Sequence, residues 1–339
     1  MSATLPDLLD PAGAARCVLW RDPSSGLAAV LVIDDLSLGP AAGGVRTRAY
    51  PDAAAMIAEA AALARAMTRK CALAGLDAGG AKAVVLDHPG LDRPAAFRAL
   101  GRFIAELDGV FRTAGDLGTT TADLAAMAET CPYVHTDDHG LAEAVARGVV
   151  ACVRACARPA GAGSAACGSR CRAAARSARR SRALAAEGAF LLVADVDPRR
   201  AHDVAEATGS HVHDPKDILL APVDILAPCA VGGVVTAEVA AATPAWALCG
   251  AANNLLAEPA VAEALRARGI LHVPDVVASA GAVIEGIGRS VMHLADREPL
   301  IAALGTTAGE LLAESAATGL TTEALAGRRA AARIAAARR

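Results

Sequence analysis

The sequence predicts an α/β protein of two domains, in which a mixed sheet comes first and a parallel sheet second, followed by a C-terminal helix. Three observations predict this fold class. The chain has 339 residues, enough for two cores, and 54% of them are apolar. Its first third alternates strand-like and helical stretches. Beyond about residue 140, short strands are separated by helices, which is typical of a parallel sheet with right-handed crossovers.

The first domain is predicted to cover residues 1–138. Its expected elements are strands at 17–20 and 28–33, a helix at 53–69, a loop "GLDAGGAK", a strand "AKAVVLD", and helices at 94–107 and 121–129. The helix at 53–69 is supported by Met56, Ala60, Leu63 and Met67, whose spacing places them on one apolar face. Lys70 then falls at its C-terminal end, and Lys82 opens a strand directly after two glycines.

The second domain is predicted to cover residues 139–298. Its expected strands are 191–194, 225–226, 247–249 and 271–273. Residues 299–339 are rich in Ala and Arg and are expected to form a C-terminal helical segment that can pack back on the first domain.

Composition excludes several classes of protein. A net charge of −3 and an aromatic content of 2% give little basis for nucleic-acid binding. The apolar stretch 218–235 is interrupted by Pro222, Asp224 and Pro228, and residues 1–11 lack a basic start followed by an apolar run. We therefore expect no membrane association and a cytoplasmic location. The nine cysteines form no metal-ligand pattern, so we expect free thiols and no metal site.

Three glycine-marked blocks contain groups that can carry chemistry. They are "LGPAAGGVR" at 38–46, "RKCALAGLDAGGAK" at 69–82 and "TAGDLGTT" at 113–120. Paired glycines let backbone approach a small ligand, while two lysines offer one charge for a carboxylate and one amine for catalysis. A buried lysine beside another cation has a lowered pKa, and Asp116 is a candidate complementary acid/base. Taken singly, a lysine or aspartate in a loop is more often just a solvated residue.

Together, the blocks resemble the signature of the glutamate/leucine/phenylalanine/valine dehydrogenase family in order and spacing. The resemblance resumes in "DILAPCAVGGVV" (224–235), "CGAANN" (249–254) and "RGILHVPDVVASAGAVIE" (268–285), so it covers most of residues 30–290. It implies a Rossmann-like second domain and reversible, NAD-dependent oxidative deamination of an L-amino acid to a 2-oxo acid and ammonia. Because family members are oligomers, it also implies a homo-oligomer.

The resemblance also implies roles for individual residues. Lys70, with the backbone of Gly43 and Gly44, matches the group that holds the substrate carboxylate. Lys82 matches the catalytic lysine and Asp116 the carboxylate that shuttles protons to and from the amino nitrogen. Asn253 and Asn254 fall where the family places an amide near the substrate amino group and the cofactor ribose.

Cofactor residues follow from the same resemblance. Asp195 matches the acid on the adenosine ribose, which favours NAD over its 2′-phosphorylated form. Cys229 and Ala230 lie in the matching "APCAVGG" block and are expected beside the cofactor.

The substrate side chain is bounded by position 42. Glutamate-specific relatives carry a lysine just before the double glycine, and this chain has Ala42 there. An apolar substrate is therefore expected, with phenylalanine, leucine and valine left as alternatives.

One stretch departs from the family. Ser169–Ala178 reads "SRCRAAARSA" where the family carries "VAVQGxGxVG". Such a composition is what a GC-rich glycine/valine stretch yields when it is read one nucleotide out of register. Our hypothesis is that roughly residues 160–182 come from a frameshifted reading, the alternative being an authentic divergent segment. Without the glycines, side chains at 173, 175 and 178 take the space of the pyrophosphate, so that NAD binds weakly or not at all.

Two smaller departures lie near the expected nicotinamide. The family's "NAGG" reads "SAGA" at Ser279–Ala282, and Val145 takes the place of a threonine. The leading hypothesis is the dehydrogenase. Its rivals are a cofactor-deficient relative that binds amino acids or oxo acids without turnover, and a different lysine chemistry on the same scaffold.

Overall fold

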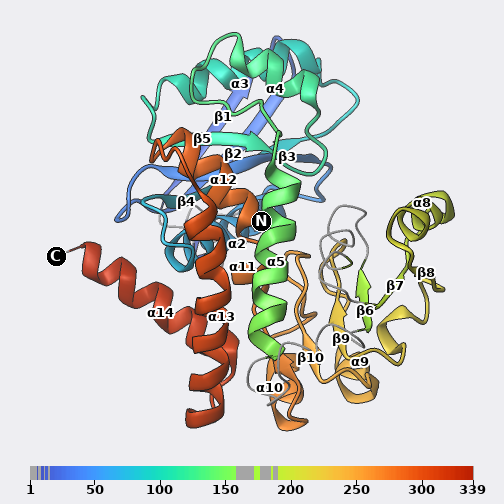
Figure 1. The fold of residues 1–339 in the computed structure, drawn as a ribbon. Helices are drawn as coiled ribbons and strands as arrows, with labels where there is room; N and C mark the ends of the chain where they lie inside the picture. Colours follow the sequence, from blue (N-terminus) through green and yellow to red (C-terminus); the bar gives the residue numbers. More distant parts are fainter. Residues whose placement is uncertain are drawn as a thin grey trace. The chain divides into compact units, whose positions relative to one another are not determined.

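Figure 1 shows the computed structural model, which describes residues 16–157 and 190–338, the backbone of 172–175, and isolated positions near the N-terminus and at 185. The chain divides into two compact units. Unit 1 comprises Met1–Asp138, Gly286–His293 and Ala330–Arg339, and unit 2 comprises His139–Glu285 and Leu294–Arg329. Each unit has its own sheet and its own apolar core.

Unit 1 is built on a five-stranded mixed sheet in the order β1-β2-β4-β3-β5. Its strands are β1 (Cys17–Asp22), β2 (Leu27–Asp35), β3 (Ala41–Arg48), β4 (Gly79–Leu86) and β5 (Phe111–Gly115). β2 is antiparallel to both β1 and β4, whereas β3 is parallel to both β4 and β5. The prediction of a mixed sheet in the N-terminal domain is confirmed.

Helices cover both faces of this sheet. On one face, α2 (Ala53–Leu73) packs Met56, Ile57 and Ala60 against Val30, Val32 and Val84. On the other face, α3 (Arg93–Ala105) and α4 (Thr121–Ala128) enclose a core around Phe97 and Phe111. Side chains alternate between the faces of a strand, so Lys82, which pairs with Val32 in the register, lies on the α2 face.

The prediction that "GLDAGGAK" forms a loop is wrong for its second half, because β4 already begins at Gly79. A Cβ at position 80 would lie 2.2 Å from the backbone nitrogen of Thr68 and 2.4 Å from the carbonyl oxygen of Ala64. The backbone of α2 therefore approaches β4 so closely that only glycine fits. Gly80 therefore marks helix-on-strand packing, and Gly79, where a Cβ would lie 1.8 Å from the Asp35 carbonyl oxygen, marks a close approach to the end of β2. Helix α2 also extends to Leu73, which places Lys70 in its last turn.

Unit 2 contains a six-stranded parallel sheet in the order β11-β10-β9-β6-β7-β8. Its strands are β6 (Arg172–Ala175), β7 (Phe190–Val193), β8 (His211–Val212), β9 (Ile225–Ala227), β10 (Ala247–Leu248) and β11 (Leu271–His272). From the centre of the sheet, β6, β7 and β8 follow one another outward on one side, and β9, β10 and β11 follow one another outward on the other. This is the doubly wound order of dinucleotide-binding sheets, with its switch point between β6 and β9.

The remaining helices connect or cover these strands. They are α5 (Leu141–Ala157), α8 (Pro198–Thr208), the short 3₁₀ turn η1 (Ile218–Leu220), α9 (Ala237–Ala242), α10 (Ala260–Ala267), α11 (Asp275–Ala278), α12 (Gly281–Ser290), α13 (Glu298–Thr318) and α14 (Thr322–Ala337). One apolar core joins Leu226 and Leu248 on the strands to Leu265 on α10. Among the described residues, no helix combines the length and apolar character that a bilayer span requires.

The last ten residues, Ala330–Arg339, belong to unit 1. There the Arg333 guanidinium donates to the carbonyl oxygens of Cys71 (3.2 Å) and Ala72 (2.8 Å) and pairs with Asp77. These carbonyls end α2, where a cation is favoured by the helix dipole. The C-terminal segment thus secures the end of the helix that carries Lys70.

Candidate active site

Lys82 and Asp116 form an ion pair in unit 1. Lys82 projects from β4, Asp116 directly follows β5, and the Lys82 Nζ contacts Asp116 Oδ2. The Lys82 side chain is 7% exposed and that of Asp116 24%, so the pair is largely withdrawn from water. An amine and a carboxylate in contact at such a place can exchange a proton with each other or with a small bound molecule.

Gly44 on β3 lies directly against this pair. A Cβ at position 44 would be 3.0 Å from Asp116 Cβ and 3.2 Å from Lys82 Nζ. Strand register explains the meeting, because Gly44 pairs with Ala114 on β5 while β3 runs beside β4. The structure therefore brings three of the predicted site residues together.

The two ionisable groups are shifted in ways that burial and charge explain. Burial lowers the pKa of Lys82, and the nearby Asp116 carboxylate offsets this only in part. For Asp116, burial acts to raise the pKa, but the charges of Lys82 and Arg46 outweigh it and hold the pKa below its ordinary value. Asp116 is therefore a carboxylate at neutral pH, and Lys82 releases its proton more readily than a solvated lysine. The predicted lowering of a lysine pKa is confirmed in direction.

Arg46 and Glu59 complete the site, and sequence reasoning missed both. Arg46 on β3 donates from Nε to Asp116 Oδ2 at 3.1 Å, and its Nη1 meets Glu59 Oε1 on α2 at 2.6 Å. Arg46 stands two residues after Gly44, and this spacing placed it on the same face of a strand. The spacing is informative only where "AAGGVRTR" is known to be a strand.

The loop after β5 is fastened to β3. The backbone N–H of Leu117 donates to Asp116 Oδ1 at 2.7 Å, and that of Thr47 donates to the Leu117 carbonyl at 3.0 Å. The Thr119 hydroxyl donates to the Val45 carbonyl at 2.8 Å. These bonds fix the position of the Asp116 carboxylate relative to Gly44 and Arg46.

The other predicted substrate residues of unit 1 lie on neighbouring elements. Lys70 is in the last turn of α2 and only 7% exposed, two residues after Thr68, which abuts Gly80. Gly43 precedes Gly44 on β3 and packs on β4, where an added Cβ would lie 1.7 Å from the Ala81 carbonyl oxygen. Gly43 is therefore enclosed by backbone.

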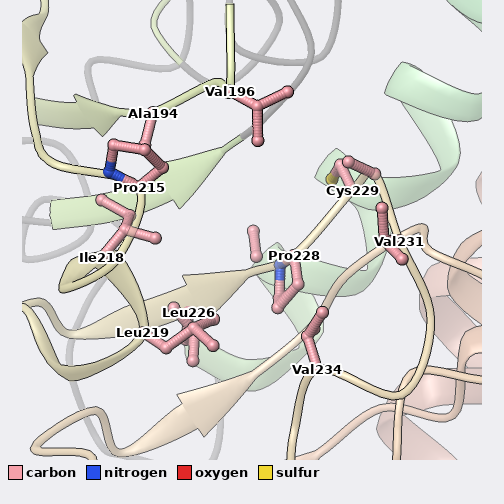
Figure 2. A pocket seen from close by; sticks show the side chains of 12 residues that line it. Ala194, Val196, Pro215, Ile218, Leu219, Leu226, Pro228, Cys229, Val231 and Val234 are labelled. Atoms are coloured by element: carbon pink, nitrogen blue, oxygen red, sulfur yellow. The ribbon is translucent and has the colours of Figure 1, made fainter.

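In unit 2, Figure 2 shows a pocket at the carboxyl ends of β7 and β9, with a volume of about 120 Å³. Its lining is apolar and is made by Ala194, Val196, Pro215, Ile218, Leu219, Leu226, Ala227, Pro228, Cys229, Ala230, Val231 and Val234. Two predicted cofactor residues, Cys229 and Ala230, are among them. Asp195 stands between Ala194 and Val196 at the end of β7, half-buried, and its Oδ1 accepts a hydrogen bond from the Asp197 N–H at 3.0 Å.

Asn253 and Asn254 lie in a loop of unit 2 that is held from two sides. The backbone N–H of Asn254 donates to Asp275 Oδ2 at 3.0 Å, and Asn254 has a left-handed φ of 52°. Ser279 Oγ lies 3.3 Å from Asn253 Oδ1 and donates to the Asp275 carbonyl at 2.6 Å. The Ser279 hydroxyl hydrogen therefore goes to Asp275, and the Asn253 side chain lies beside the same hydroxyl at the longer distance. Both asparagines are exposed.

The expected phosphate turn, Ser169–Ala178, lies outside the described residues except for the backbone of 172–175. That backbone forms β6, which pairs in parallel with β7 and β9. Within the described part of the chain, no cluster of three or more His, Cys, Asp or Glu side chains can hold a metal ion.

Comparison with known proteins places these features in a family context. Residues 15–133 match the family described as Glu/Leu/Phe/Val dehydrogenase, dimerisation domain, and residues 191–291 match Glutamate/Leucine/Phenylalanine/Valine dehydrogenase. The chain is 34% identical over 280 residues to leucine dehydrogenase from Geobacillus stearothermophilus, covering 79% of this chain and 76% of that one. It is 35% identical over 290 residues to valine dehydrogenase from Streptomyces coelicolor, covering 81% and 79%. Its fold is similar to the crystal structure of L-tryptophan dehydrogenase from Nostoc punctiforme, with a TM-score of 0.86, 28% identity and 99% coverage of both chains.

Proposed function

The chain belongs to the Glu/Leu/Phe/Val dehydrogenase family of amino acid dehydrogenases, and from this premise we propose that it catalyses the NAD-dependent oxidative deamination of an apolar L-amino acid. The products are the 2-oxo acid and ammonia, and the reaction is reversible. The observation that carries the proposal is the ion pair of Lys82 and Asp116 against the glycine backbone at position 44.

The roles we propose follow from the charges and pKa directions of these groups. Lys70 holds the substrate carboxylate beside the backbone of Gly43 and Gly44. Asp116, a carboxylate at neutral pH, accepts and returns protons at the amino nitrogen. Lys82, whose pKa is lowered by burial, takes a proton from water as that water attacks the imine carbon. Proton transfer then releases ammonia and leaves the 2-oxo acid.

The described residues of unit 2 fit the adenosine part of an adenine dinucleotide. The doubly wound strand order, the apolar pocket of Figure 2 and the carboxylate of Asp195 beside it suit an adenosine whose ribose hydroxyls donate to an acid. Asp195, Cys229, Ala230 and Asn253 are the residues that would hold it. The chemistry that NAD would supply there is acceptance of the hydride from the α carbon of the substrate, whose loss leaves the imine that water attacks.

The apolar character of the substrate rests on Ala42. A residue this small and uncharged, next to the double glycine, provides no partner for a second carboxylate. The relatives with named substrates include leucine, valine and tryptophan dehydrogenases, which agrees with an apolar side chain. Leucine, valine and phenylalanine are the substrates to try first.

We further propose that residues 1–138 form the substrate domain and 139–298 the cofactor domain, with 299–339 as the C-terminal helical segment. The dimerisation description of the matched N-terminal family supports a homo-oligomer. A cytoplasmic location remains our proposal, and it agrees with the free thiols, rather than disulfides, of the cysteines in the described residues.

The decisive experiment follows NADH formation from L-leucine, L-valine and L-phenylalanine at alkaline pH, together with thermal shifts produced by each amino acid and by NAD. We expect turnover that falls about a thousandfold in Lys82→Ala. Arg102→Ala is the matched control, because Arg102 is an exposed residue of α3 on the opposite face of the sheet. Stabilisation by an amino acid without any response to NAD would favour the cofactor-deficient relative, which the absence of glycines in "SRCRAAARSA" also favours.

A further inference from the structure

Among the described residues, the Asp116 carboxylate pairs with two cations, Lys82 and Arg46, and only Lys82 belongs to the proposed chemistry. Besides Lys82, the Arg46 guanidinium faces both carboxylate oxygens, with Nε 3.1 Å from Oδ2 and Nη2 3.5 Å from Oδ1. The Arg46 side chain is 17% exposed. This forked arrangement fits a planar guanidinium and fixes the plane of the carboxylate.

Arg46 is itself held from the other side. Glu59 on α2 accepts from Arg46 Nη1 at 2.6 Å, so the guanidinium bridges a helix and the loop that follows β5. Arg48 also reaches Glu59 Oε1, at 3.5 Å, but its side chain is 52% exposed and its guanidinium lies over the Tyr50 ring. Glu59 therefore orients Arg46, and Arg48 shares Glu59 without reaching Asp116.

We propose that Arg46 is a positioning residue whose guanidinium, held by Glu59, keeps the Asp116 carboxylate paired and oriented whether or not Lys82 carries a proton. This inference rests on the proposed function, because it assigns Arg46 to the Lys82–Asp116 pair that the proposal uses. Removing a proton from Lys82 alone would leave a largely buried carboxylate without its counter-ion, which is costly. With Arg46 in place, the carboxylate remains paired after Lys82 becomes neutral.

Charge supports the same role. An arginine stays protonated throughout the working range of an enzyme, so its charge is permanent, whereas the charge of Lys82 is not. The charged groups that face Lys82 are Asp116 after β5, Arg46 on β3 and Glu59 on α2. Of these, Arg46 acts in the same direction as burial and lowers the pKa of Lys82, while the two carboxylates raise it. Lys70 and Tyr50 are further ionisable groups on α2 and after β3.

The test compares Arg46→Gln and Arg46→Lys with the control Arg48→Gln. Arg48 is a cation of the same strand, and its guanidinium contacts Glu59 but not Asp116. The pKa of Lys82 is measured directly by titrating protein labelled with carbon-13 at lysine Cε. The chain has only three lysines, Lys70, Lys82 and Lys216, so the signals can be assigned from single lysine variants. The pH dependence of kcat/KM for the best amino acid substrate is recorded in parallel.

We expect Arg46→Gln to raise the pKa of Lys82 by about 1 or more and to move the acidic limb of kcat/KM to higher pH by the same amount. Arg46→Lys keeps the charge but loses the fork. The acidic limb of kcat/KM should therefore stay within about 0.5 pH unit of its wild-type position, while kcat falls about tenfold. Arg48→Gln should leave the limb within about 0.3 of wild type because its charge is exposed.

Equal shifts in Arg46→Gln and Arg48→Gln would overturn the inference, as would an unchanged Lys82 pKa in folded Arg46→Gln. Should Arg46→Gln not fold, Arg46→Lys decides the matter, because an unchanged kcat or a limb displaced by about 1 contradicts positioning by the fork. A wild-type chain without turnover contradicts the proposed function alone. In that case the lysine titration still tests Arg46.

Discussion

Gly44→Ala tests whether the backbone of β3 packs on the reacting pair. The added Cβ would lie 2.8 Å from the carbonyl oxygen of Gly115, 3.0 Å from Asp116 Cβ and 3.2 Å from Lys82 Nζ. Relief requires movements of a few tenths of an ångström in β5 and in the ion pair. Overpacking of this kind costs about 1–3 kcal/mol of folding free energy. Misplacement of the reacting groups should lower kcat about tenfold to a hundredfold.

Two other glycines give a graded series around this variant. At Gly43 the new Cβ would lie 1.7 Å from the Ala81 carbonyl oxygen, and because that atom belongs to β4 we expect little folded protein from Gly43→Ala. At Gly286, within α12, a Cβ would meet no heavy atom within 4 Å beyond the neighbouring backbone of its own helix, so alanine should leave activity unchanged and add about 0.5–1 kcal/mol through helix propensity. Guanidinium unfolding gives the stabilities and steady-state kinetics with the best amino acid gives kcat.

The result that would refute this reasoning is a Gly44→Ala protein with wild-type kcat and KM. Such a protein would mean that the pair accommodates a methyl group at position 44 and that the close approach has no part in the chemistry. A loss of activity in Gly286→Ala equal to that in Gly44→Ala would point instead to general destabilisation.

Three further predictions follow from single features. Burial lowers the pKa of His272 to about 4, below the 6.5 of the unfolded chain. The neutral, buried imidazole therefore contributes fully to the free energy of unfolding above pH 6.5, and this contribution is lost as the pH falls towards 4. Between pH 7.5 and pH 5, guanidinium unfolding should show a loss of stability that is about 2 kcal/mol larger in wild type than in His272→Leu. Asp195→Ala should raise the ratio of kcat/KM with NADP to that with NAD by about tenfold or more, because the repulsion of a 2′-phosphate is removed. Arg333→Ala should cost about 1–2 kcal/mol in the same unfolding assay by freeing the carbonyl of Ala72 at the end of α2, whereas an unchanged midpoint would contradict this capping role.

The parts of the fold that the sequence predicted well are those with a long local pattern. The 3.6-residue period of Met56, Ala60 and Leu63 predicted α2 to within a few residues of its end. By contrast, β3 was not predicted, because "AAGGVRTR" contains two glycines and two arginines and lacks strand character. It forms because β4 and β5 pair with it on both sides, and this is a tertiary effect that no local window contains.

The candidate site likewise contains residues that were predictable from the sequence and residues that were not. The meeting of Gly44, Lys82 and Asp116 was expected because the three glycine-marked blocks resemble a family, and strand register now supplies the physical reason. Arg46 and Glu59 could not be joined in advance. Their contact depends on how α2 is rotated over the sheet, which the close approach of its backbone at Gly80 determines. Sequence spacing does not encode that rotation.

Seen as one chain of contacts, Glu59, Arg46, Asp116 and Lys82 alternate in sign and sum to zero charge while Lys82 is protonated. Loss of the Lys82 proton leaves the four groups with one net negative charge, which Arg46 offsets only in part because Glu59 shares its guanidinium, so a further cation beside Asp116 is favoured. The ammonium group of an amino acid beside Asp116 is such a cation. Substrate binding would then replace the charge that Lys82 gives up, so the arrival of the ammonium and the activation of the lysine favour each other.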